Sequence, residues 1–291
     1  MSSKQVVVVD FSEFEHRKTV ITHAVMQAAE TEGVFYVKNH GISQGLVDSM
    51  FARSADFFKL DDVTKKRYCF DKPRNAGWEK MAQIRPSTGT PDMKESISLG
   101  FHTADRCPSE ADCAGFADAA AAFMAACQDM SMKLMSCFAV GLGFPEDFFS
   151  QHHDVAKTDS QQTMRCLYYH DTSQQKVPAN YWRAGAHTDF DTLTLLFQRS
   201  GEKGLEICPG RKAVTEFAIG DEWSPADPMA GAITVNIGDM LMQWSDDRLK
   251  STFHRGPNKK YAPISGLDFI SAAMQRNYNA LEALKQEQVA A

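Results

Sequence analysis

A histidine and an aspartate stand two residues apart, directly before an apolar stretch of the chain. They are His187 and Asp189, and the apolar run 192–197 follows them. Side chains alternate along a β-strand, so residues two apart point to one face and lie a few ångström from each other. A neutral imidazole beside a carboxylate supplies two ligands of a metal site. Taken alone, His187 is better explained as a strand residue whose ring is satisfied by hydrogen bonds.

His254 is the candidate for a third ligand. It follows a second apolar stretch, 232–244, in which Gly238 and Asp239 indicate a tight turn between two strands. This hairpin and the strand after it would bring His254 back against the strand of the His-Asp pair. Two histidines and one carboxylate on one face of a metal, with the opposite positions open, form the ligand set of non-haem Fe(II) enzymes. A metal site is therefore predicted.

Length and composition indicate a globular protein that buries a substantial core. The chain has 291 residues, of which 43% are hydrophobic and 23% are charged, as in ordinary globular domains. A net charge of −6 gives no basic footprint for nucleic acid, and no apolar run approaches the ~20 residues of a membrane span. The seven cysteines are odd in number and form no CxxC pair. With no long apolar signal core near the N-terminus, we expect a cytoplasmic protein with reduced thiols.

The first half of the chain is expected to be mainly helical. Apolar residues at helical spacing predict helices at 12–32, 44–58 and 114–140, and short apolar runs predict strands at 6–10, 34–37 and 94–100. Gly33 is expected to end the first helix, and Gly141 and Gly143 the third.

From Thr163 onward the pattern changes to short strands separated by turn signals. Strands are predicted at 164–169, 192–197, 205–207, 232–237 and 241–244. Ser265, followed three residues later by an acid, opens a predicted C-terminal helix. Many short strands after a helical half predict an α+β fold, in which a β-sandwich or jelly roll is carried on helices.

Several motifs occur in a fixed order over nearly the whole chain. They lie at 8–11, 33–42, 57–60, 94–95, 141–149, 187–198 and 231–255. This ordered set resembles the isopenicillin N synthase-like family of Fe(II)/2-oxoglutarate-dependent oxygenases.

The resemblance implies a double-stranded β-helix (jelly roll) core and oxidation of a small organic substrate, by hydroxylation, desaturation or ring rearrangement. It implies Fe(II) held by His187, Asp189 and His254, with 2-oxoglutarate and O2 as cosubstrates. Tyr169 stands where the family places a tyrosine near 2-oxoglutarate, although an aromatic residue at the edge of the core explains it too. His40, in an Asn-His-Gly turn, is interpreted as structural.

The resemblance also suggests how the chain is divided. We expect an N-terminal oxygenase region at 1–110, a long supporting helix within 111–150, the jelly-roll core at 160–264, and a C-terminal helix at 265–291.

The chain departs from the family pattern after His254. There the family carries a strand with an Arg-x-Ser pair, whose arginine binds the distal carboxylate of 2-oxoglutarate through two parallel hydrogen bonds. Here no such pair occurs: Pro263 stands near the place of the arginine, and Ser265 is better explained as a helix cap. We therefore expect one strand to be missing near 256–261. Either residues are omitted there from the printed sequence, or the gene product lacks the strand, or Arg255, Lys259 or Lys260 takes over the carboxylate.

Two other functions stay open. The missing arginine motivates the first, a metal-dependent oxidase that takes all its electrons from the substrate and does not use 2-oxoglutarate. The second is a non-catalytic jelly-roll binding protein. Release of CO2 from labelled 2-oxoglutarate separates the oxygenase from the oxidase, and a binding protein would show no Fe(II)-dependent uptake of O2.

Overall fold

The computed structural model describes residues 6–84, 89–158, 162–171, 177, 181–209 and 222–256. The helices of this part are α1 (Phe14–Thr31), α2 (Gln44–Lys59), α3 (Asp62–Lys65), α4 (Phe116–Leu142) and α5 (Asp239–Trp244). The strands are β1 (Val8–Asp10), β2 (Val34–Lys38), β3 (Gly77–Lys80), β4 (Lys94–Gly100), β5 (Thr163–Tyr169), β6 (Ala184–His187), β7 (Leu193–Leu196), β8 (Glu206–Cys208), β9 (Ser224–Pro225), β10 (Ala232–Ile237) and β11 (Phe253–Gly256).

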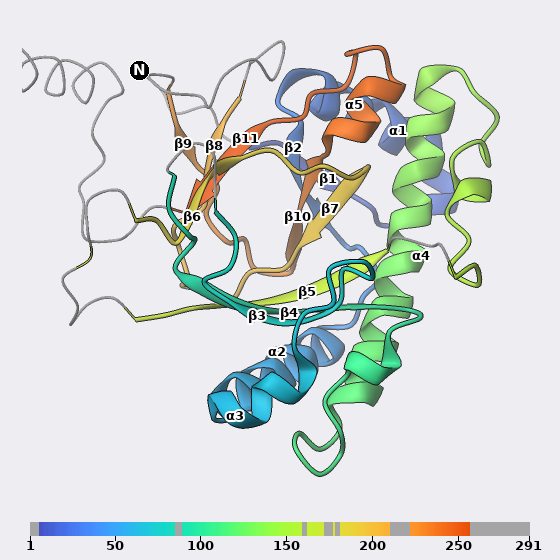
Figure 1. Ribbon diagram of the computed structural model, residues 1–291. Coiled ribbons are helices and arrows are strands. Elements are labelled where there is room, and N and C mark those ends of the chain that lie inside the picture. Colours follow the sequence, from blue (N-terminus) through green and yellow to red (C-terminus); the bar gives the residue numbers. More distant parts are fainter. Residues whose placement is uncertain are drawn as a thin grey trace, which may run out of the picture.

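The strands form three sheets (Figure 1). The first has the order β1-β2-β10-β7, in which β10 runs antiparallel to both neighbours and β1 joins parallel to β2. The second has the order β6-β11-β8-β9, with β11 antiparallel to both β6 and β8. The third is the antiparallel sheet β3-β4-β5. Sheets of short strands, with helices packed beside them, confirm the α+β jelly roll expected from the sequence.

The main core lies where α1 and α4 meet the first sheet. The two helices pack against each other, and α4 also packs against α2. Phe35 of β2, Ile233 of β10 and Phe138 of α4 have no exposed surface and belong to one apolar cluster. Burying a side chain of this size contributes about 1.5–3 kcal/mol. This core fixes β10, and through it β7, on the side of the jelly roll that faces the candidate site.

Most predicted elements are present, with ends shifted by a few residues. Gly33 follows α1 with a φ of 68°, as expected of a glycine that ends a helix. Gly143 does the same for α4 with a φ of 88°. The prediction that Gly141 also ends this helix is wrong. Gly141 lies inside α4, and an added Cβ there would stand 2.2 Å from the Cγ atom of Met26. The glycine therefore permits close packing against α1 and does not end the helix.

The strand predicted at 241–244 is wrong as well. Residues Asp239–Trp244 form the helix α5, and Gly238 with Asp239 is the start of that helix rather than a hairpin turn. The amides of Asp239 and Met240 donate to carbonyl groups of residues 189–191 and are therefore not available for a strand ladder. The C-terminal helix predicted at 265–291 lies outside the described residues. No described helix is long and apolar enough to cross a membrane, and all seven cysteines are free thiols.

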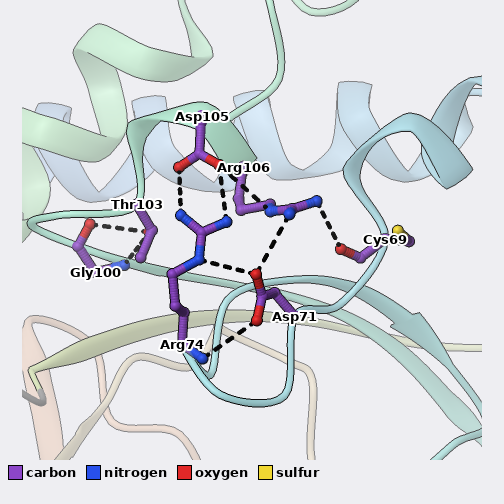
Figure 2. Close-up of polar contacts among 7 residues, drawn as sticks. All are labelled: Cys69, Asp71, Arg74, Gly100, Thr103, Asp105 and Arg106. Atoms are coloured by element: carbon purple, nitrogen blue, oxygen red, sulfur yellow. Dashed lines mark hydrogen bonds and ion pairs between the residues drawn. The ribbon is translucent and has the colours of Figure 1, made fainter.

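Charged side chains hold the N-terminal region around the third sheet. Figure 2 shows Arg74 bound to Asp71 and, through two parallel hydrogen bonds of 2.9 Å, to Asp105, while Arg106 also reaches Asp71. These contacts join the turn before β3 to the short 3-10 helix after β4. The arginine contacts hold the pKa of both carboxyl groups below its usual value.

A buried ion pair lies against the same sheet. Lys65 of α3 is bound to Glu95 of β4 at 2.9 Å, and their side chains are only 4% and 3% exposed. The indole of Trp78 donates to the same carboxylate at 2.7 Å. The pair therefore fixes α3 against β3 and β4.

We expect Lys65→Ala to lower the free energy of unfolding by about 3–5 kcal/mol, because it leaves the buried carboxylate of Glu95 without its cation. Urea unfolding followed by circular dichroism measures this. Lys59→Ala is the control, since Lys59 is 77% exposed beside Asp56 and its loss should cost less than ~1 kcal/mol. Equal effects of the two substitutions would contradict the expectation.

Candidate metal centre

The structure brings His187, Asp189 and His254 together, as the sequence predicts. One ligand atom from each lies within 4.8 Å of the others. Asp189 Oδ1 stands 3.5 Å from Nε2 of His254 and 4.0 Å from Nε2 of His187. The two histidines are directly paired across β6 and β11, with ring centroids 4.2 Å apart. No other group of three such residues within reach of one ion occurs in the described ranges.

Backbone carbonyl groups fix the orientation of both imidazole rings. Nδ1 of His187 lies 2.8 Å from the carbonyl of Gly185, and Nδ1 of His254 lies 3.3 Å from the carbonyl of Thr252. A carbonyl only accepts, so each neutral ring carries its proton on Nδ1 and leaves the lone pair on Nε2. Both lone pairs are then on the nitrogens that face Asp189. This donor set fits a divalent transition metal such as Fe(II).

The prediction that His187 and Asp189 share one strand is wrong. β6 ends at His187, and Asp189 lies beyond it in a loop that leads to β7. The carboxylate of Asp189 is instead oriented by Asn236 of β10, whose Nδ2 lies 3.4 Å from Oδ2. Asn236 is 3% exposed. It was not identified from the sequence, where the only sign of it is an amide inside the apolar run 232–237.

The N-terminus of α5 holds the loop that carries Asp189. The amide of Gly238 donates to Thr192 O at 3.0 Å, and the amide of Asp239 donates to Asp189 O at 2.8 Å. Gly238 lies so close to the loop that an added Cβ would stand 1.9 Å from Asp191 O. A glycine at this position is therefore required by the close approach of two backbone segments.

The three residues open onto a large cavity. Its volume is about 1990 Å³, and its walls include β5, β7 and the ends of β6 and β11. Tyr169, at the end of β5, lines the same cavity and pairs in register with Lys94 of β4. His40 stands apart from the three ligands: its Nδ1 accepts from the Ile42 amide, and burial lowers the pKa of its ring. This supports its interpretation as a structural residue.

Comparisons with known proteins decide the family. Residues 6–130 match the family described as non-haem dioxygenase in morphine synthesis N-terminal, and residues 160–265 match the 2OG-Fe(II) oxygenase superfamily. The UPF0676 protein C1494.01 of Schizosaccharomyces pombe is 31% identical over 88% of this chain and 77% of its own length. The chain belongs to the 2OG-Fe(II) oxygenase superfamily.

Further relatives agree with this assignment. A full-length Neurospora crassa protein, whose crystal structure is a complex with alpha-KG, matches with a TM-score of 0.74 and 29% identity, over 89% of this chain and 80% of that one. The 2-oxoglutarate-Fe(II) type oxidoreductase hxnY of Emericella nidulans is 24% identical over 96% of this chain and 92% of its own length. That alignment spans 337 positions, more than the 291 residues of this chain. The relative therefore carries tens of residues that this oxygenase lacks.

This oxygenase uses Fe(II), 2-oxoglutarate and O2 to oxidise a small substrate. The family, the fold class, the activity and the cofactors expected from the sequence are thereby confirmed.

The suggestion that Arg255 of the oxygenase takes over the distal carboxylate of 2-oxoglutarate stays a prediction, since Arg255 lines the cavity but also has partners of its own. Arg255 follows His254 on β11, so its side chain points to the opposite face of the sheet. There it is bound to Glu206 at 2.7 Å and lies 4.0 Å from the ring centroid of Trp223. Its guanidinium also lies over Trp182, at 5.2 Å.

Arg183 of the oxygenase lies just before β6, whose register against β11 shifts between His187 and Ala184. It lines the cavity, and its buried Nε atom has no hydrogen-bond partner in the described part of the chain. Arg183 was not identified from the sequence. Lys259 and Lys260, the other suggested partners, lie outside the described residues, as do Pro263, Ser265 and any break in the chain between 256 and 261.

Gly238→Ala should displace the loop of Asp189, because its Cβ has no room beside Asp191 O. We expect a loss of about 1–3 kcal/mol in stability and weaker binding of Co(II), a spectroscopic substitute for Fe(II). Thermal unfolding and Co(II) titration measure the two effects. Gly45→Ala is the control, since nothing lies within 4 Å of its added Cβ. A Gly238→Ala protein as stable as the Gly45→Ala protein would disprove the close approach.

Proposed function

We propose that His187, Asp189 and His254 hold the Fe(II) of this oxygenase. The observation that carries the proposal is the convergence of one carboxylate oxygen and two Nε2 lone pairs within 4.8 Å. The three residues line the cavity, so a metal that they hold would be accessible from it. When bound, the iron supplies the activation of O2, coupled to decarboxylation of 2-oxoglutarate.

The protein's own part is to position and enclose the reactants. The backbone carbonyls at 185 and 252 keep both rings oriented, and Asn236 keeps the carboxylate oriented. The cavity beside them holds the substrate close to the metal and away from bulk water. We propose that Tyr169 contacts 2-oxoglutarate from β5. The net charge of −6 supports a small organic molecule, rather than nucleic acid or a membrane, as the partner.

We further propose that the jelly-roll core, at 160–264, lacks the strand expected near 256–261. In this proposal the jelly-roll core follows the N-terminal region 1–110 and the long helix within 111–150. A C-terminal helix at 265–291 follows the core. Among the described strands, β7 pairs on one side only, with β10, and all its residues line the cavity. The cavity of about 1990 Å³ exceeds the ~300–1,000 Å³ of ordinary small-molecule sites. The longer alignment with the Emericella nidulans relative supports the same conclusion.

We propose that Arg183 meets the distal carboxylate of 2-oxoglutarate in place of the absent arginine. It stands four residues before His187 and lines the cavity with a buried nitrogen free to donate. At ~3.3 Å per residue, the two positions are at most about 13 Å apart. The flexible arginine side chain and the five-carbon acid together cover that distance.

His254→Ala removes one ligand and should weaken Co(II) binding on the order of 100-fold or more. It should also abolish the release of CO2 from labelled 2-oxoglutarate by the Fe(II)-loaded protein. Titration followed by visible absorption measures the first effect, and trapping of labelled CO2 the second. His23→Ala, which changes an exposed histidine of α1, is the control.

The outcomes separate the rival functions. A His254→Ala protein that binds Co(II) as tightly as the wild type would refute the metal centre. A wild-type protein that binds the metal and takes up O2 without releasing CO2 would instead be the oxidase that does not use 2-oxoglutarate.

Arg183→Ala should raise the Kd of 2-oxoglutarate about tenfold or more, because a charge-assisted pair contributes ~1.5–3 kcal/mol. Calorimetric titration of the Mn(II)-loaded protein measures this. Arg248→Ala is the control, since it removes an exposed cation that is bound to Glu30 and does not line the cavity, and it should leave the Kd unchanged. The same Kd in wild type and Arg183→Ala would rule out this role.

A further inference from the structure

Asp239 contacts both chain segments that carry the proposed ligands. Its amide donates to Asp189 O at 2.8 Å. Its carboxylate accepts from Thr188 Oγ1 at 3.0 Å through Oδ2, and from Ser251 Oγ at 2.5 Å through Oδ1. Each oxygen of one carboxylate therefore holds a different segment.

The two hydroxyl groups lie next to the ligands in the sequence. Thr188 stands between His187 and Asp189, and Ser251 precedes His254 by three residues. Both are buried, at 6% and 4% exposure. A carboxylate only accepts, so both hydroxyls donate their protons to Asp239. Without the carboxylate, two buried hydroxyls would lose a charge-assisted hydrogen bond each.

We propose that Asp239 is a positioning residue that sets the spacing between the His187–Asp189 segment and His254. The inference rests on the proposed metal centre, because it concerns the geometry of that centre. Asp239 is not one of the three residues whose ligand atoms converge, so it acts through Thr188, Ser251 and the backbone of Asp189. Groups outside the first coordination sphere that orient ligands typically change metal affinity 10–100-fold.

This assignment gives a function to the Gly-Asp pair at the start of α5. Gly238 permits the close approach to the loop, and Asp239 uses that approach to connect the loop with the segment before β11. The backbone amide of Asp239 is kept in substitutions by alanine or asparagine, because only proline lacks it. Substituting the side chain therefore tests the carboxylate bridge alone.

The experiment compares Asp239→Ala, Asp239→Asn and Asp118→Ala by Co(II) titration, the visible spectrum of the bound Co(II), and thermal unfolding of the metal-free protein. Asp239→Ala should raise the Co(II) Kd about tenfold and change the spectrum, which reports ligand geometry. Asp239→Asn should restore much of both, since an amide still bridges two hydroxyls. Asp118→Ala removes an exposed acid from the first turn of α4 and should match the wild type.

Ser251→Ala tests the bridge from its other end. Alone it should weaken Co(II) binding severalfold, and combined with Asp239→Ala it should add little, because both changes remove the same contact. If the Asp239→Ala protein does not fold, the Co(II) Kd of Ser251→Ala is compared with that of Asp118→Ala. Equal Kd values for these two proteins would then overturn the inference.

A folded Asp239→Ala protein with the Kd and spectrum of the wild type would overturn the inference, as would full additivity of the two substitutions. Either result leaves the metal centre intact, provided that wild type binds Co(II) and His254→Ala does not. Failure of the wild-type protein to bind Co(II) would overturn the metal centre and this inference together.

Discussion

The pairing of β11 with β6 is the contact on which the candidate centre depends. It sets His254 opposite His187 in register, so two residues far apart in the sequence present their rings side by side. The third member does not come from this pair of strands. Because β6 ends at His187, the carboxylate of Asp189 reaches the rings from a loop, and α5 and β10 hold that loop in place. The centre is therefore made by three strands, one loop and one short helix.

The three proposed ligands could be predicted from the sequence, but the contacts that position them could not. His187, Asp189 and His254 are residue types with few alternative roles at such spacing, and two apolar runs near them are long enough to be recognised as the strands β7 and β10. The six residues of α5 are too few for helical and strand periodicity to differ. Their conformation depends instead on carbonyl groups about fifty residues earlier in the chain, which sequence periodicity does not reveal.

The residues that position the proposed ligands could not be predicted for a related reason. Asn236 looks like an interruption of an apolar run, and Asp239 looks like a turn residue, because their partners are supplied by tertiary contacts. Gly141 resembles a helix end for the same reason: only the close packing of Met26 shows why a glycine stands inside the helix. Arg183 stands in a stretch without a recognised motif, and only the folded structure shows that it lines the same cavity as the three proposed ligands.

The orientation of the two imidazoles has an evolutionary consequence. The groups that fix which ring nitrogen carries the proton are main-chain carbonyls, at Gly185 and Thr252. Every amino acid supplies such a carbonyl, so a point mutation at either position keeps the acceptor as long as the backbone path is kept. The side chains that line the rest of the cavity do not determine which ring nitrogen carries the proton. Selection for a different substrate can therefore change the cavity wall without altering which nitrogen of either ring faces Asp189.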